Sequence, residues 1–253
     1  MIGLPQNFFY NRVIKMQEPI LPSLENNNYE RRRVQMAAPR LHAAVLHEIN
    51  RTFPELKGLK VLDAPCGAGA LSEELAKAGA IVEGLDLAPI QASDYGATYK
   101  VENLETCTLQ ADCYDLILSV EGIEHLQNPM AWFEKISLAL KPGGVLILST
   151  PNPDALSSRW KVFLRGYPQY FSPVAMSHEF FRESGHIHSI PYLFIEWACL
   201  RNALELTSIK TKSERLPAMI EKFLHKIFYN KFSEKIGVLI KGSVAIYTIR
   251  KPI

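Results

Sequence analysis

From residue 60 onward, short strand-like runs alternate with longer segments of helical periodicity. The strand-like runs lie at 60–64, 80–85, 98–101, 115–120, 145–150, 204–211 and 243–250. Apolar residues at helical spacing predict helices over 30–50, 70–78 and 129–140. Strands alternating with helices are typical of a parallel sheet with helices on both faces. We therefore predict an α/β fold whose continuously apolar strands are buried on both sides.

The segment from 151 to 203 interrupts this alternation and holds 10 of the 25 aromatic residues. We predict that it caps the carboxyl ends of the strands, where open α/β sheets bind ligands. A lid packed by its own aromatic side chains is the alternative. The expected divisions are an N-terminal helical segment (1–58), a core (59–152), a cap (153–203) and C-terminal strands (204–253) with an insert at about 213–242.

Composition narrows the class of protein without identifying it. With 253 residues, 47% of them hydrophobic and 21% charged, the chain can bury a full core, and disordered, collagen-like and coiled-coil classes are excluded. Charge is uneven along the chain. Residues 1–60 hold 9 basic and 5 acidic side chains (+4), 61–207 hold 9 and 18 (−9), and 208–253 hold 10 and 3 (+7).

The insert at 213–242 holds six of the ten basic side chains of this C-terminal segment, and its apolar residues from Leu216 to Ile227 form one helical face. Two interpretations stay open. The insert covers the sheet edge or a homodimer interface, or it is an interfacial helix that contacts anionic lipid or a negatively charged carrier-linked acceptor. No basic stripe with interleaved aromatic residues lies beside the predicted ligand site. We therefore do not expect nucleic-acid binding.

The four cysteines, Cys66, Cys107, Cys113 and Cys199, have neither a disulfide-framework spacing nor zinc-cluster pairs. The N-terminus lacks the apolar core of a signal peptide, and no apolar run is long enough to span a membrane. We therefore expect a cytoplasmic protein, with peripheral membrane contact left open.

A glycine turn gives the sharpest chemical signal. The run VLDAPCGAG places Gly67 and Gly69 between a strand and a helix, where a backbone without Cβ atoms lets a ligand approach the helix N-terminus. Ser72 replaces the third glycine of a nicotinamide-dinucleotide fingerprint, which weakens that interpretation. The next strand ends in Asp86, which could accept hydrogen bonds from both ribose hydroxyls of a nucleoside, or cap a helix.

The chain from about 55 to 152 resembles class I S-adenosylmethionine-dependent methyltransferases. VLDAPCGAG is similar to that family's first motif, GLD to its second, and YDLILSVEGIEHLQNPMAWFEKISLALKPGGVLILSTPN to its segment from the fourth strand to the fifth. The resemblance implies a Rossmann-like, mostly parallel seven-stranded sheet, S-adenosylmethionine as cofactor and methyl transfer to a small-molecule acceptor.

The resemblance also implies site residues. Asp63 would lie near the cofactor's amino group, Gly67 and Gly69 against its methionine part, and Asp86 on the ribose. Asn103 stands where the family usually has an acidic residue facing the adenine amino group. Its amide oxygen can accept the same hydrogen bond from that amino group. The full expected cofactor set is Asp63, Ala64, Cys66, Gly67, Gly69, Asp86, Leu87, Asn103, Leu104, Val120 and Glu121, with Tyr29 and Arg33 as candidates to close over it.

The segment Glu121-Gly122-Ile123-Glu124-His125 repeats the E-x-x-E-H pattern of ubiquinone-biosynthesis O-methyltransferases, in which these residue types can hold a divalent metal. We expect no metal and take His125 as the candidate base, with a structural histidine as the alternative. The cap holds His178, His186 and His188. The pair His186 and His188 could chelate a metal, but no third ligand lies at a recognisable spacing. Any of these histidines, Tyr167 or Tyr170 could act as an acceptor-side base.

Three functions follow for testing. The leading one is methyl transfer to a small or medium-sized, partly apolar acceptor, most simply at oxygen. A non-catalytic binding subunit with the same fold and a nicotinamide oxidoreductase are the alternatives, and the missing third glycine disfavours the latter.

Overall fold

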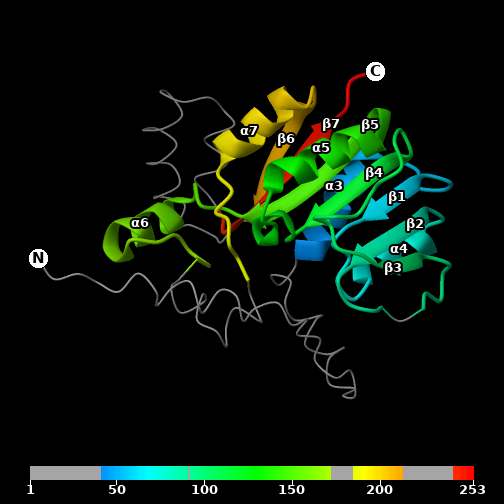
Figure 1. Cartoon of the computed structure of the whole chain (residues 1–253), viewed down its shortest axis with the longest axis horizontal. Coiled ribbons are helices and arrows are strands. Elements are labelled where there is room, and N and C mark those ends of the chain that lie inside the picture. The colour runs from blue at the N-terminus through cyan, green and yellow to red at the C-terminus, as the bar shows by residue number, and fades with distance from the viewer. Residues whose placement is uncertain (1–40, 91, 172–184, 213–241) are drawn as a thin grey trace, which may run out of the picture.

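The structure is a computed structural model of the chain, and it describes residues 41–90, 92–171, 185–212 and 242–253. Within these ranges seven strands form one sheet (Figure 1). The strands are β1 (Lys60–Asp63), β2 (Ile81–Asp86), β3 (Thr98–Val101), β4 (Tyr114–Val120), β5 (Leu140–Pro151), β6 (Glu205–Lys212) and β7 (Val244–Arg250).

The strand order places a ligand crevice at the middle of the sheet. The order is β3-β2-β1-β4-β5-β7-β6. The strands run parallel except β7, which is antiparallel to both β5 and β6. The chain progresses outward in one direction from β1 and in the other from β4, so the order reverses between these two strands. Open α/β sheets bind ligands outside the carboxyl ends of the strands at such a reversal.

Helices cover both faces of the sheet (Figure 1). On one face, α3 (Leu41–Thr52) and α4 (Ala70–Lys77) share an apolar core with Val61 and Leu116. On the other face, α5 (Pro129–Ala139) and α7 (Tyr192–Arg201) share a core with Leu62 and Ile117. Successive strand residues point to opposite faces, so the continuous apolar runs of β1 and β4 feed both cores.

Local signals in the sequence explain how α5 is placed. Asn128 precedes it and accepts a hydrogen bond from the Ala131 N–H through its side-chain oxygen at 3.1 Å, while Pro129 occupies the first turn. The buried face of the helix carries Trp132, whose indole N–H donates to the Ser119 hydroxyl of β4 at 3.1 Å. The helix is thereby fixed against the strand that leads into the site.

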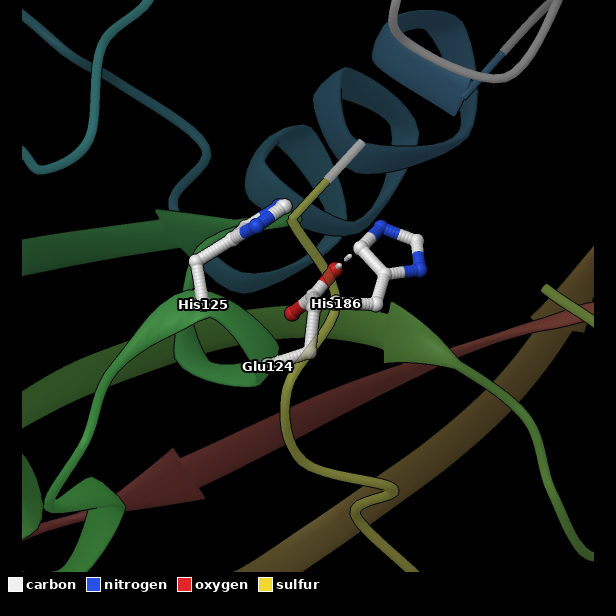
Figure 2. Close-up of side chains that lie close together, drawn as sticks. All are labelled: Glu124, His125 and His186. Atoms are coloured by element: carbon white, nitrogen blue, oxygen red, sulfur yellow. Dashed lines mark ion pairs between the residues drawn. The ribbon is translucent and has the colours of Figure 1, made fainter. Parts of the chain in front are cut away.

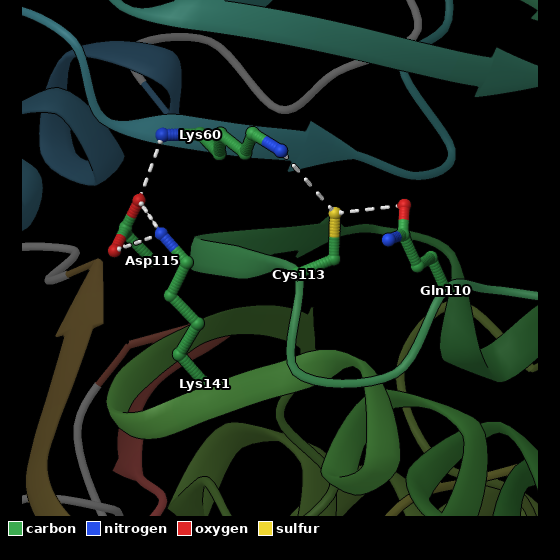
Figure 3. Close-up of polar contacts among 5 residues, drawn as sticks. All are labelled: Lys60, Gln110, Cys113, Asp115 and Lys141. Atoms are coloured by element: carbon green, nitrogen blue, oxygen red, sulfur yellow. Dashed lines mark hydrogen bonds and ion pairs between the residues drawn. The ribbon is translucent and has the colours of Figure 1, made fainter.

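Polar contacts join the starts of the three central strands at the edge opposite the crevice (Figure 3). Both oxygens of Asp115 accept from the Lys141 ammonium at 2.7 Å, and one also accepts from the Lys60 backbone N–H at 2.9 Å. The Cys113 thiol donates to Gln110 at 3.4 Å. These partly exposed contacts hold β1, β4 and β5 in register far from the site.

The predicted strands are confirmed to within a residue or two, with one exception. The expected strand at 145–150 is the end of a longer β5 that begins at Leu140 and pairs there with Tyr114. The register shifts between Tyr114 and Leu116, so Pro142 and the glycines form an irregularity within the strand. The predicted strand began only at 145, because proline and glycine commonly interrupt strands and helices. The helix predicted over 129–140 accordingly ends at Ala139.

The predicted cap divides into unlike parts. Its final helix, α7, buries Ile195 and Ala198 in the core on one sheet face, so it belongs to the helical layer. Its first helix, α6 (Leu156–Arg165), buries only Ser158, and its Trp160 and Phe163 stack on each other while exposed.

Several predictions fall outside the described residues. They concern the part of the N-terminal helix before residue 41, Tyr29, Arg33, His178 and almost all of the insert at 213–242. The four cysteines are all described, and each is buried. Among the described helices, none is both long and apolar enough to cross a membrane.

Candidate functional site

The glycine turn follows β1 at the carboxyl edge of the sheet, beside the reversal of strand order. Gly67 and Gly69 have φ of +57° and +83°, a region that glycine occupies without strain. A Cβ atom at Gly67 would meet no atom within 4 Å, so this side of the turn is open to a ligand. A Cβ at Gly69 would lie 2.6 Å from the Tyr99 hydroxyl oxygen, so packing as well as backbone conformation requires glycine there.

Asp86, at the end of β2, organises this turn. One carboxylate oxygen accepts from the Gly67 N–H at 2.9 Å and the other from the Ala88 N–H at 3.2 Å. Each oxygen keeps a further lone pair, so the side chain can still accept from ribose hydroxyls. The carboxylate that the sequence indicated as a ribose acceptor therefore also holds the glycine turn in place.

Asp63, the last residue of β1, is a buried carboxylic acid beneath the turn. Its Oδ2 accepts from the Ser72 hydroxyl at 2.7 Å, whereas its Oδ1 has no hydrogen-bond partner. Burial raises the pKa of Asp63 to about 7, with the Ser72 hydrogen bond opposing and the nearby Asp86 adding to the rise. A cationic group brought against Oδ1 would satisfy this orphaned acceptor.

The other expected cofactor residues surround the same edge with different exposure. Ala64, Cys66, Leu104 and Val120 are buried, while Leu87 is 68% exposed. Asn103 is exposed on the loop after β3, where its side-chain oxygen accepts from the Glu105 N–H at 2.9 Å. That bond forms a local Asx turn and leaves one lone pair of the amide oxygen available.

The segment 120–125 after β4, here called the EH loop, packs directly against the glycine turn. A Cβ on Gly122 would lie 2.2 Å from the Pro65 side chain, so only glycine allows this approach. Glu121 has φ of +51°, and its carboxylate accepts from the Ser149 hydroxyl at 3.3 Å. Burial raises the pKa of Glu121 to about 7.

Glu124 is the most buried acid of the EH loop, with no exposed surface. The Thr150 hydroxyl donates to its Oε2 at 3.1 Å, and its Oε1 has no hydrogen-bond partner. Burial, followed by the neighbouring charge of Glu121, raises the pKa of Glu124 well above its ordinary value.

The cap segment 185–188 is attached to this loop. The backbone N–H groups of Ile187 and His188 both donate to the Glu124 carbonyl at 3.0 Å. The rings of His125 and His186 meet edge to face with centroids 4.8 Å apart, and His186 Nε2 lies 4.0 Å from Glu124 Oε1 (Figure 2). Burial lowers the pKa of both imidazoles, that of His186 to about 4 with the help of His125.

Sequence reasoning did not bring His186 together with Glu124 and His125. The three can offer ligand atoms within 4.8 Å of one another, so among the described residues they form a group able to hold a metal. For the cap histidines, the expectation of no metal rested on the lack of a third ligand at a recognisable spacing, and for the EH pattern it rested on the occurrence of that pattern in relatives that hold no metal. No local spacing could have found one, because the cap reaches the EH loop only through the tertiary fold.

Comparison with known proteins agrees with this geometry. The family model described as "Methyltransferase domain" matches residues 34–209, well over half of the chain. A ubiquinone biosynthesis O-methyltransferase from Coxiella burnetii is 28% identical over 173 residues, covering 60% of this chain and 73% of that protein. The enzyme of the same name from Cereibacter sphaeroides is 37% identical over 110 residues, covering 40% of this chain and 44% of that protein.

Solved structures share the fold at low identity. An S-adenosylmethionine-dependent methyltransferase from Mesorhizobium loti has a TM-score of 0.55 at 18% identity, covering 82% of this chain and 97% of that one. Phosphoethanolamine N-methyltransferase 2 from Haemonchus contortus, solved with S-adenosyl-L-methionine, has a TM-score of 0.55 at 18% identity over 83% of this chain and 53% of that one. With the glycine turn, Asp86 and the EH loop assembled at one sheet edge, the chain belongs to the class I S-adenosylmethionine-dependent methyltransferases.

Proposed function

We propose that this methyltransferase acts on an oxygen atom of a small or medium-sized, partly apolar acceptor. The observation that carries the proposal is the position of the EH loop. It contacts the glycine turn through Gly122 and Pro65, and it holds the cap segment 185–188 through the Glu124 carbonyl. An acceptor under the cap would therefore meet the cofactor beside His125. The curated relatives that match the chain are named as O-methyltransferases, which supports oxygen as the acceptor atom.

The residues at the sheet edge fit S-adenosylmethionine. Gly67 leaves open space where a side chain would stand, Asp86 faces the turn with spare acceptor capacity, and Asp63 has a buried oxygen without a partner. We infer that Asp63 stabilises the positive end of the cofactor, that Asp86 accepts from the ribose, and that the exposed amide of Asn103 meets the adenine. Val120 and Glu121 would border the methionine part.

The protein's share of the chemistry is alignment and proton removal. The cofactor, when bound, supplies a methyl group already activated by its sulfonium. The chief remaining requirement is to hold an acceptor oxygen in line with that methyl group. His125 lies at the surface of the loop, but neighbouring atoms partly desolvate its ring and lower its pKa. Its imidazole is therefore largely neutral near pH 7 and able to take a proton.

Two measurements test the proposal. Titration calorimetry of the full-length protein with S-adenosylhomocysteine should show one site per chain. Methyl transfer from labelled S-adenosylmethionine should then proceed to phenols and alcohols bearing apolar substituents, and not to amines of the same shape. The His125→Gln variant should bind the cofactor as the wild type does and lose at least about 10²-fold in kcat, the usual contribution of a general base. Transfer to the amines alone would refute the choice of oxygen.

A further inference from the structure

Glu124, His125 and His186 converge from two segments about sixty residues apart in the chain. Figure 2 shows the first two on the EH loop and His186 on the cap segment opposite, with the carboxylate pointing at the His186 ring. Their ligand atoms lie within 4.8 Å of one another. Glu124 is wholly buried, and its Oε1, the oxygen that faces His186, has no hydrogen-bond partner. An unpartnered buried carboxylate oxygen is costly unless a cation or donor is brought to it.

The hydrogen bonds around the two imidazoles assign their protons. The Nδ1 atom of His186 lies 3.2 Å from the Tyr170 carbonyl oxygen, which can only accept, so Nδ1 carries the hydrogen and Nε2 presents a lone pair toward Glu124. A neutral His125 imidazole likewise keeps one ring nitrogen without a proton. One nitrogen of each imidazole and the Glu124 carboxylate can therefore each offer an electron pair once Glu124 is ionised.

The surroundings resemble the outer shell of a metal centre. Backbone carbonyls that fix the tautomer of each imidazole, and a hydroxyl that holds the second carboxylate oxygen, are the usual partners of metal ligands. Here the Tyr170 carbonyl orients His186, and the Thr150 hydroxyl holds Glu124 Oε2 at 3.1 Å.

We propose that Glu124, His125 and His186 bind one first-row divalent transition-metal ion. This ligand set differs from the one that the E-x-x-E-H resemblance implies, because His186 of the cap takes the place of Glu121. The Glu121 carboxylate is not in the converging group and accepts from Ser149 instead. The ion would balance the negative charge that the EH loop buries.

The donor set selects the class of ion. Two imidazoles and one carboxylate favour Zn²⁺, Fe²⁺, Co²⁺ or Mn²⁺ over Mg²⁺ and Ca²⁺, which prefer oxygen ligands. Bonds of about 2.0–2.1 Å place tetrahedral ligand atoms about 3.3 Å apart, so the side chains would close by roughly 1.5 Å on the ion. His125 is exposed and His186 partly exposed, so both rings have room to turn toward the fixed Glu124.

Three protein ligands leave a position open for another oxygen. A bound acceptor hydroxyl there would lose its proton more readily, which deepens the proposed function and rests on it. With the ion bound, the nitrogen of His125 that could act as a base would coordinate the metal, so the ion would replace His125 in promoting proton loss. Binding of the ion itself does not depend on that function. The bound ion would also link the cap segment to the EH loop through His186.

The test measures metal binding directly. Tag-free, full-length protein treated with a chelator is titrated with Co²⁺, followed by visible absorbance, and with Zn²⁺, followed by calorimetry. We expect one ion per chain, and at least about 100-fold weaker binding in His186→Ala and Glu124→Gln. His188→Ala is the matched control, because this cap histidine contacts the Gln127 carbonyl and lies outside the group. It should change the affinity by less than about threefold.

Glu121→Gln separates the two possible ligand sets. It should leave the metal affinity within about threefold of the wild type. A large loss in Glu121→Gln with none in His186→Ala would overturn the proposed set, and absence of stoichiometric binding to the wild type would overturn the site. A urea unfolding curve of each variant confirms that it is folded. A chain that methylates hydroxyls without binding metal refutes this inference alone, whereas one that binds metal and methylates no hydroxyl refutes the proposed function alone.

Discussion

Replacing Asp63 with asparagine should change how the stability of the protein depends on pH. Asp63 is buried and raised in pKa to about 7, against an ordinary value of 3.8. Folding therefore favours its neutral form. The contribution of protonated Asp63 to the free energy of unfolding is fully present below the ordinary pKa. It is lost as the pH rises toward the pKa of the folded state. Asparagine is neutral throughout and keeps an oxygen for the Ser72 hydroxyl, so the variant should not show this loss.

The size of the effect follows from the two pKa values. At about 1.36 kcal/mol per pH unit, their separation corresponds to about 4 kcal/mol between fully acidic and fully basic conditions. Part of this stabilisation is already lost at about pH 4.5. The free energy of unfolding should therefore fall by about 3 kcal/mol between about pH 4.5 and about pH 8.5. Asparagine leaves an unpaired amide N–H group in place of the orphaned oxygen, a cost of about 1–3 kcal/mol that does not vary with pH.

Urea unfolding of the full-length protein at these two pH values measures the difference. The free energy of unfolding of the wild type should fall by about 3 kcal/mol more than that of Asp63→Asn. Asp94→Asn makes the same chemical change at an exposed position and controls for the loss of one carboxylate. If the wild type and Asp63→Asn differ by the same amount at both pH values, Asp63 does not titrate as its burial requires.

Further predictions concern the cofactor edge and the core. Affinity for S-adenosylmethionine should rise with pH up to about 7 in calorimetry, because the cofactor's ammonium selects ionised Asp63; a flat profile would contradict this pairing. Asp86→Asn should weaken cofactor binding at least about tenfold by calorimetry, because a charged acceptor is lost from the Gly67 N–H. Gly122→Ala should lower the free energy of unfolding by about 1–3 kcal/mol, because its Cβ would lie 2.2 Å from Pro65. Trp132→Phe should cost about 1–3 kcal/mol in the same assay, because it removes a buried indole hydrogen bond; unchanged unfolding curves would count against either of these two.

The strands could be predicted because their burial on both faces is written into continuous apolar runs. In β4, for example, Leu116 to Leu118 are all buried and alternate between the two cores. The start of β5 could not be predicted, because Pro142 and two glycines have the composition of a turn although the strand continues through them. The insertion of β7 between β5 and β6 is likewise a choice of pairing that no local pattern encodes.

The candidate site divides in the same way. The glycine turn and Asp86 could be found because strand, turn and helix signals lie within about twenty residues of one another. That Asp86 accepts from the Gly67 N–H was not foreseen, since it depends on how two neighbouring strands end. The approach of His186 to Glu124 depends on the path of the cap, which the sequence pattern does not specify.

The pairing of β6 with β7 alone has a consequence for how the protein is made. The strands from β1 to β5 emerge from the ribosome in an order that lets each find a neighbour already synthesised. β6 is different, because its partner among the described strands lies beyond a further 31 residues, 213–243. At roughly 5–20 residues per second, β6 waits about 2–6 s for β7. During that interval both β5 and β6 have unpaired edges, so nascent chains at this stage are the ones most in need of chaperone protection.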